Sequence, residues 1–195
     1  MAEDYSLHWF DPRQPVGCGR GGNLPHWRQM GSRYFVTWRT ADSMPEAKVK
    51  QWVQEREAWL AKHPEPHDDQ AKAEYDALFL ARWERWLDEC HGECLLKRPE
   101  IRDVVERAMR HFDQARYRLG EFIVMSNHVH VVITPWGDHT LSAILHSWKS
   151  FTSHEINRML QRTGTLWQKE SFDHIVRSPE EMERIVSYIR NNGRR

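Results

Sequence analysis

The stretch "VMSNHVHVVITPW", residues 124–136, constrains the fold more than any other part of the chain. It is a short β-branched run that is apolar on both alternating faces, which is typical of a strand buried inside a sheet. We therefore expect a central strand over residues 128–135, and its two histidines, His128 and His130, are the polar exceptions that need an explanation.

Other segments supply the remaining elements of such a sheet. Further strands are predicted at 34–40, 117–125 and 171–177, and helices at 99–112, 141–160 and 178–192. The order is strand, helices, strand, strand, helix, strand, helix. This is the split β-α-β-β-α-β pattern of ferredoxin-like α+β folds with an antiparallel sheet, followed by one extra C-terminal helix.

At 195 residues the chain fits a single domain over residues 1–195. An N-terminal arm of about residues 1–32 has glycines among arginines and no periodicity, so we expect an extended arm or loop. From about residue 44 to 112 the pattern is helical and rich in charge, which predicts a helical insertion after the first strand.

The two histidines of the central strand lie on one face, because side chains alternate along a strand. Two residues apart, their Cα atoms are about 6.6–7 Å apart, which lets both imidazole rings converge on a single divalent ion. The alternative is a pair of surface histidines on a solvent-facing strand. The apolar residues on both faces disfavour that alternative, since buried imidazoles need their hydrogen bonds satisfied.

The last helix begins with a capping box. Ser178 is the N-cap, Pro179 is the first helical residue, and Glu181 follows the N-cap by three residues. Further along, Tyr188 and Asn192 are four residues apart and therefore lie on one stripe. A tyrosine at such a position is usually a packing residue. If this helix crosses the sheet face that carries the histidines, the amide could instead complete a metal site.

Charge and cysteine content limit the classes of partner and compartment. Net charge is +0, but residues 1–96 carry 12 Lys/Arg and 16 Asp/Glu, while residues 97–195 carry 16 and 12. The C-terminal half is therefore the part that could face phosphate. No apolar run is long enough to span a membrane and no signal segment opens the chain, so we expect a cytoplasmic protein.

The three cysteines are too few for a disulfide framework, and their odd number fits a reducing compartment. The segment "CHGEC", residues 90–94, could be half of a metal site, but it lacks a second ligand pair at zinc spacing. The simpler interpretation is a helix end broken at Gly92.

Several stretches together resemble one family. "YFVTWRTADSMP", "VMSNHVHVVITP", "LSAILHSWKSFTSHEIN" and "LWQKESFDHIVRSPEEMERIVSYIRNN" are similar to the REP-associated tyrosine transposases, domesticated relatives of the single-tyrosine HUH transposases. The resemblance runs from about Leu24 to Asn192, with Ser126 where the family usually has proline. It implies a ferredoxin-like nuclease core that acts in DNA transposition and recombination.

Carried over by position, the resemblance implies that His128 and His130 are metal ligands, that Asn192 is a third ligand and that Tyr188 is the nucleophile. The resemblance implies Mg²⁺ or Mn²⁺ as the cofactor and single-stranded DNA with a hairpin as the partner. The protein would be a monomer or homodimer that does not bind membranes. Attack by the tyrosine would give a covalent 5′-phosphotyrosine and a free 3′-hydroxyl. The candidate DNA-binding residues are Lys149, Arg158, Arg177, Arg184 and Arg190, with Arg20, Trp27 and Arg28 in the arm.

Two other functions stay open at this point. A metal-dependent phosphodiester hydrolase could use the same histidine pair with water as nucleophile, and Asp173 is then the nearest candidate for an extra carboxylate ligand. A non-catalytic DNA-binding relative is the second alternative, which the neutral net charge favours and the retained histidines and tyrosine disfavour.

Overall fold

The computed structural model describes residues 9–11, 13, 17–20, 25–29, 31–63 and 69–192. The chain divides into two compact units, one made of residues 1–40 and 95–195 and the other of Ala41–Cys94. Within the described residues, no helix is long and apolar enough to cross a membrane.

A four-stranded sheet forms the centre of the larger unit. Its strands are β3 (Tyr34–Arg39), β4 (Tyr117–Val124), β5 (His128–Pro135) and β6 (Phe172–Ile175). They pair antiparallel in the order β4-β5-β3-β6, so the first and third of them along the chain are the two inner strands. This is the ferredoxin-like order expected from the split pattern, and the predicted α+β fold is confirmed.

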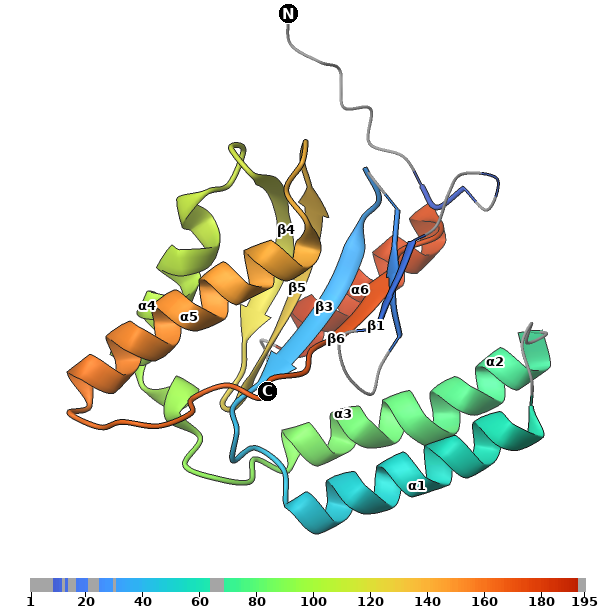
Figure 1. The fold of residues 1–195 in the computed structure, drawn as a ribbon, viewed down its shortest axis with the longest axis horizontal. Coiled ribbons are helices and arrows are strands. Elements are labelled where there is room, and N and C mark those ends of the chain that lie inside the picture. The colour runs from blue at the N-terminus through green and yellow to red at the C-terminus, as the bar shows by residue number, and fades with distance from the viewer. Residues whose placement is uncertain are drawn as a thin grey trace, which may run out of the picture. The chain divides into compact units, whose positions relative to one another are not determined.

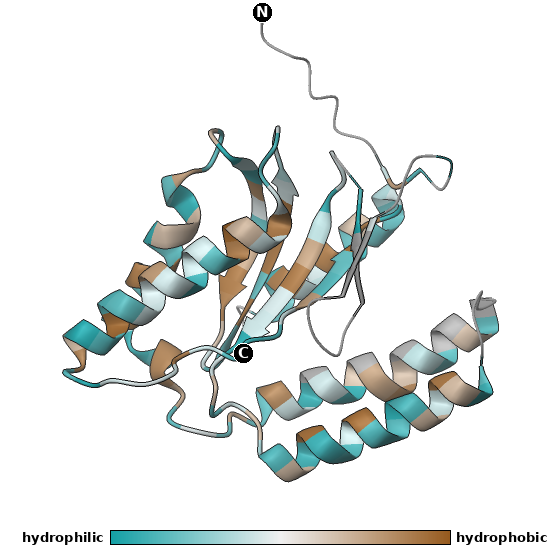
Figure 2. Ribbon diagram, in the orientation of Figure 1, coloured by the Kyte–Doolittle hydropathy of each residue, from teal (hydrophilic) through white to brown (hydrophobic). Residues whose placement is uncertain are grey.

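Helices cover both faces of the sheet, α4 and α5 on one side and α6 on the other (Figure 1). A 3₁₀ turn (Leu95–Lys97) leads into α4 (Pro99–His111), and α5 (Leu141–Met159) and α6 (Pro179–Asn192) follow the third and fourth strands. Figure 2 shows hydrophobic colours along the middle of the sheet. The alternate residues of β3 and β5 therefore enter two separate apolar clusters, one under α4 and α5 and one under α6.

The tight turn before the histidine strand is fastened from two sides. Ser126 and Asn127 connect β4 to β5, as the sequence predicts. The backbone N–H of Leu96 donates to the carbonyl of Ser126 at 3.0 Å, and the N–H of Thr40 donates to the carbonyl of Asn127 at 2.8 Å. Thr40 and Leu96 both belong to the larger unit and flank the segment of residues 41–94, so the chain leaves and re-enters the larger unit at this one turn.

The N-terminal arm contains more structure than its glycine-rich sequence predicts. Strands β1 (Gly17–Arg20) and β2 (Pro25–Arg28) pair antiparallel as a short ribbon. The guanidinium of Arg28 donates to the hydroxyl of Ser142 at 3.0 Å, so the end of the ribbon reaches the first turn of α5. A strand of four residues is too short to leave a clear periodic signal in the sequence.

The smaller unit is a helical hairpin. It consists of α1 (Glu46–Lys62), α2 (Asp69–Tyr75), a π-helical turn (Asp76–Leu80) and α3 (Ala81–Asp88). Trp52 and Trp59 are buried against Phe79, and the indole N–H of Trp52 donates to the Phe79 carbonyl at 3.1 Å. The unit ends at Cys94, whereas α4 packs in the core of the larger unit, so it is shorter than the insertion expected over residues 44–112.

The "CHGEC" segment closes this unit with a disulfide between Cys90 and Cys94, whose Cα atoms are 6.2 Å apart. The cysteine count did not predict this bond. Helix α3 ends at Asp88, four residues before the expected break at Gly92, and the first residue with left-handed backbone after the helix is Cys90, with a φ of 54°, followed by Gly92 with a φ of 83°. Among the described residues, no group of three or more His, Cys, Asp or Glu side chains could hold a metal ion.

Candidate active site

The two histidines of β5 point to the sheet face that α6 covers, and both are almost fully enclosed. His128 is 1% exposed and His130 is 0% exposed. Their Nε2 atoms lie 3.0 Å apart. Both rings therefore converge through the same nitrogen, as the alternation along the strand predicts.

The other ring nitrogen of each histidine has its own partner. Nδ1 of His128 lies 2.8 Å from Oδ1 of Asn127, and Nδ1 of His130 lies 2.8 Å from Oγ1 of Thr37. The amide oxygen of Asn127 can only accept, so Nδ1 of His128 carries the proton in this arrangement. If Thr37 accepts in the same way, both Nε2 atoms present lone pairs, which is the form that a metal ligand requires.

Burial keeps both imidazoles neutral. It lowers the pKa of His128 to about 4. Burial and the neighbouring charge of a protonated His128 hold the pKa of His130 well below its ordinary value. At neutral pH the pair is therefore uncharged, and protons do not compete for the two Nε2 atoms.

The spacing of the two nitrogens fits a small divalent cation. Ligands on adjacent corners of an octahedron with bonds of about 2.0–2.1 Å are about 2.8–3.0 Å apart. The Nε2–Nε2 separation of 3.0 Å is at the upper end of that range. Two lone pairs at this distance repel one another unless a cation or a proton lies between them.

Helix α6 brings the candidate nucleophile to the pair. The hydroxyl of Tyr188 lies 3.2 Å from Nε2 of His130, and the two rings meet edge to face with centroids 5.2 Å apart. Phe35 of β3 stacks on His130 and meets the edge of Tyr188, with centroid distances of 5.5 Å and 6.3 Å. These contacts determine the direction of the tyrosine side chain.

The start of α6 is held by a variant of the predicted capping box. Ser178 accepts from the N–H of Glu181 at 3.2 Å, as expected of an N-cap. The carboxylate of Glu181 does not return to Ser178. It accepts from the backbone N–H of Arg177 at 2.6 Å and lies 2.7 Å from Nε2 of His174, which ties α6 to β6.

Asn192 lies in the last turn of α6, four residues after Tyr188. Its side chain is 7% exposed, and its Nδ2 atom is buried without a hydrogen-bond partner among the described residues. The unpaired atom is a hydrogen-bond donor, so a negatively charged group such as a phosphate would satisfy it, whereas a cation would be bound through the amide oxygen. Its role as third ligand stays a prediction.

Asp173, the carboxylate that a hydrolase would need, lies on the other side of the sheet. Its register partner on β3 is Val36, which belongs to the cluster under α4 and α5. Register partners in an antiparallel pair share a face, whereas Thr37 is the partner of His130. The structure therefore separates Asp173 from the histidine pair.

The predicted DNA-binding side chains have various surroundings. Lys149 directs Nζ to the carbonyls of residues 168–170, at 3.1, 3.1 and 3.4 Å, and burial lowers its pKa to about 8. Arg158 and Arg190 form exposed ion pairs with Glu155 and Glu121. Their contacts with DNA stay predictions.

Two further arginines, Arg177 and Arg184, are exposed near the start and middle of α6, and the guanidinium of Arg177 lies 5.4 Å from the centre of the Phe10 ring. The side chains of Arg20 and Trp27 lie outside the part of the chain that the structure describes. Arg28 is described and contacts α5, as stated above.

Sequence reasoning missed three residues that line the site. Asn127 and Thr37 hold the histidine rings, and Arg39 is the register partner of His128 on the same face. Burial lowers the pKa of the Arg39 guanidinium to about 10, so it stays charged at neutral pH. Asn127 could have been noticed because it precedes the first histidine, but the two β3 residues are found only through strand pairing.

Comparison with known proteins gives a family match. Residues 95–192, which make up half of the chain, match the family described as "Transposase IS200 like". This range contains both histidines, Tyr188 and Asn192. No curated protein matches the sequence.

Two solved structures are similar. One is a REP-associated tyrosine transposase bound to a REP hairpin, with 14% identity, a TM-score of 0.46 and coverage of 87% of this chain and 72% of that chain. The other is a candidate transposase from Deinococcus radiodurans R1, with 14% identity, a TM-score of 0.38 and coverage of 82% and 89%.

Proposed function

Because the chain belongs to the IS200-like transposase family, we propose that it is a metal-dependent endonuclease and strand transferase. Its substrate would be single-stranded, hairpin-forming DNA of the repetitive extragenic palindrome type. The observation that carries the proposal is a row of three atoms. Oη of Tyr188 lies 3.2 Å from Nε2 of His130, which lies 3.0 Å from Nε2 of His128.

The residues present fit a Mg²⁺ or Mn²⁺ ion. His128 and His130 would hold it through their Nε2 atoms, and Asn192 would add an amide oxygen from α6. When bound, such a cation neutralises charge on the phosphate and leaves coordination positions open for it. The imidazoles are neutral and their rings are held through Nδ1, so each Nε2 atom is oriented to bind a cation.

The covalent step rests on Tyr188. A tyrosine hydroxyl is a weak nucleophile at neutral pH because its ordinary pKa is about 10. Position therefore matters more than acidity, and the ring is fixed by Phe35 and His130. Oη would attack the phosphorus, the bond from phosphorus to the 3′ oxygen would break, and the tyrosine proton would be lost while the leaving oxygen gains one.

The products are a 5′-phosphotyrosine and a free 3′-hydroxyl. Because the new phosphodiester keeps the energy of the old one, another 3′-hydroxyl can reverse the step and join two strands without ATP. Arg39 is compatible with the same assignment, since its register position is opposite His128 and a guanidinium that stays charged at neutral pH suits the negative charge of a phosphate.

The test is a covalent-adduct assay. A labelled single-stranded oligonucleotide with a hairpin and a single-stranded flank is incubated with the protein and Mg²⁺ or Mn²⁺, and the products are separated under denaturing conditions. We expect a slowly migrating protein–DNA adduct that a chelator prevents and that Tyr188→Phe abolishes. Tyr75→Phe, which alters a tyrosine of the separate helical unit, is the matched control and should form the adduct.

The outcomes separate this proposal from the two alternatives. An adduct from Tyr188→Phe would show that another residue is the nucleophile. Cleavage that survives Tyr188→Phe without an adduct would indicate a hydrolase that uses water. Hairpin binding without any adduct or cleavage by the unchanged protein would indicate a non-catalytic DNA-binding relative.

A further inference from the structure

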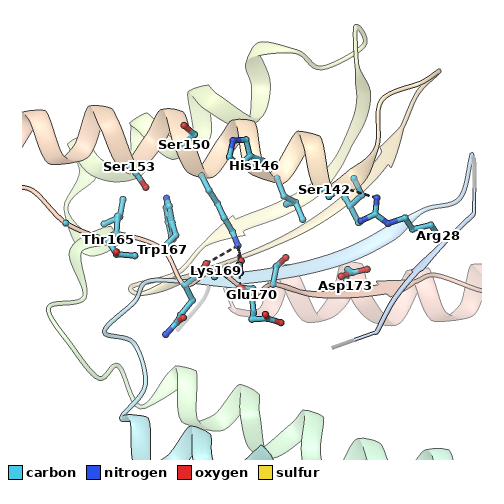
Figure 3. A pocket seen from close by; sticks show the side chains of 17 residues that line it. Arg28, Ser142, His146, Ser150, Ser153, Thr165, Trp167, Lys169, Glu170 and Asp173 are labelled. Atoms are coloured by element: carbon cyan, nitrogen blue, oxygen red, sulfur yellow. Dashed lines mark hydrogen bonds between the residues drawn. The ribbon is translucent and has the colours of Figure 1, made fainter. Parts of the chain in front are cut away.

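A cavity of about 480 Å³ lies on the sheet face opposite the histidine pair. It is bordered by α5, the segment of residues 164–171, Asp173 of β6 and Arg28 of β2 (Figure 3). Its volume is within the range of about 300–1,000 Å³ that is typical of sites for small organic groups. Nothing in the proposed cleavage step uses it.

The floor of the cavity is apolar and its walls are polar. Leu141, Leu145, Leu166 and Trp167 contribute the apolar lining. Hydroxyl groups surround it, from Ser142, Ser150, Ser153, Thr165 and Ser171. Trp167 is 4% exposed and its N–H donates to Thr152 at 2.8 Å, so it is a fixed part of the wall and not the exposed stacking residue that a loop tryptophan could be. This combination suits a flat, partly polar ring.

The wall formed by residues 168–170 contains an unused acceptor. Oε2 of Glu170 is buried and has no hydrogen-bond partner among the described residues. The segment cannot easily turn this group away, because Nζ of Lys149 holds the carbonyls of residues 168, 169 and 170. A buried carboxylate oxygen of this kind is stabilised by a ligand that donates a hydrogen bond to it.

Cationic groups border the same cavity. Figure 3 shows Arg28 and Ser142 at one end, and Ser153, Thr165 and Trp167 at the other. Arg28 uses one guanidinium nitrogen to bond Ser142, and Lys169 is exposed on the cavity wall. Acceptors inside and cations at the border match a ligand with an N–H-bearing ring and an attached phosphate.

We propose that this cavity binds one unpaired nucleotide, with the amino group of its base directed to Glu170 and its phosphate near Arg28. This inference rests on the proposed function in one respect, which is that the nucleotide belongs to a single-stranded segment of the DNA substrate. Cytosine, adenine and guanine carry the required amino group, whereas thymine and uracil do not. The site therefore reads base identity on the face of the sheet away from the cleavage chemistry.

The test compares bases that differ in the amino group. Fluorescence anisotropy measures binding of eight-nucleotide oligodeoxycytidine and oligodeoxyuridine to Tyr188→Phe, which binds without cleaving. A second pair of single strands differs by guanine or hypoxanthine at each purine. In at least one pair, we expect the amino-bearing strand to bind about 5- to 150-fold more tightly, the range for one carboxylate–base contact.

Glu170→Gln in the same background should reduce that preference, because the amide keeps one acceptor oxygen but loses the negative charge that strengthens a hydrogen bond from the base. Glu100→Gln, on the exposed first turn of α4, is the matched control and should retain it. If Glu170→Gln does not fold, Glu170→Asp replaces it and should also reduce the preference, since the shorter side chain withdraws the carboxylate from the base. A competition experiment with free dCMP distinguishes a nucleotide within a DNA strand from a free nucleotide. If dCMP competes at concentrations near those of the oligonucleotide, the cavity is a site for free nucleotides.

The results separate this inference from the proposed function. A Glu170-dependent base preference supports the cavity site even if the unchanged protein forms no adduct. Equal binding within both pairs, or a preference that Glu170→Gln leaves intact, overturns the cavity site even if Tyr188 forms the adduct.

Discussion

The buried histidine pair should make the fold sensitive to mild acid. Burial lowers the pKa of His128 from its ordinary 6.5 to about 4 in the folded chain, and burial together with the charge of a protonated His128 holds the pKa of His130 well below its ordinary value. At pH values between the folded and the unfolded pKa of His128, the unfolded chain binds a proton at this histidine that the folded chain does not. The stability that the pair contributes is therefore fully present above pH 6.5 and is lost as the pH falls towards 4.

The magnitude follows from the linkage relation. From pH 7 to pH 5, a group with an unfolded pKa of about 6.5 and a folded pKa of about 4 removes about 2 kcal/mol from the free energy of unfolding. Burial also lowers the pKa of His130, so its protonation acts in the same direction, and we expect the pair to remove at least about 2 kcal/mol. Both side chains are almost fully buried, so solvent screens this effect little.

The assay is urea unfolding in the presence of a chelator at several pH values between 7 and 5. The double variant His128→Gln/His130→Gln removes both titrating groups, and its free energy of unfolding should fall by at least about 2 kcal/mol less over this range than that of the unchanged protein. His154→Gln removes an exposed histidine of α5 and serves as the control. Parallel pH curves for the unchanged protein and the double variant would refute the reasoning.

Three further changes test single contacts. Thr37→Val keeps the shape of the side chain but removes the hydroxyl bonded to the second histidine, so calorimetric titration should show Mn²⁺ affinity reduced about 10- to 100-fold; unchanged affinity would exclude a role in holding the ring. Ser178→Ala removes the N-cap of α6 and should lower the free energy of unfolding by about 1 kcal/mol in urea titrations, against no change if the cap is unimportant. Gly92→Ala places a Cβ 2.6 Å from the Asp42 carbonyl at a φ of +83°, and it should lower the melting temperature more than Gly164→Ala, whose φ is +105° with open space around it; equal melting temperatures would contradict this.

Local patterns predicted the elements of the larger unit well. The strand expected over residues 128–135 has those bounds, and the helix expected over residues 141–160 ends one residue earlier. Alternation along β5 was enough to place both histidines on one face, because the period of a strand is two regardless of its neighbours. The predicted stripe of α6 likewise brings Tyr188 to the pair.

Pairwise contacts between distant segments could not be predicted in this way. Thr37 and His130 are 93 residues apart along the chain and meet only through the register of β3 with β5. Lys149 was expected to face DNA, but its Nζ bonds three carbonyls of a loop about 20 residues further on. Neither contact follows a short period, and periodicity is the main structural signal that a single sequence carries.

The anchoring of the turn at Ser126 and Asn127 has a consequence for how proteins of this shape can diversify. Thr40 and Leu96, which border residues 41–94, bond to neighbouring carbonyls of that one turn. The segment between these two residues is therefore a closed loop as far as the larger unit is concerned. Doubling the length of a loop raises its entropic closure cost by only about 0.6 kcal/mol. A segment held in this way can be shortened, enlarged or exchanged for another module while the strand that carries the histidines keeps its place.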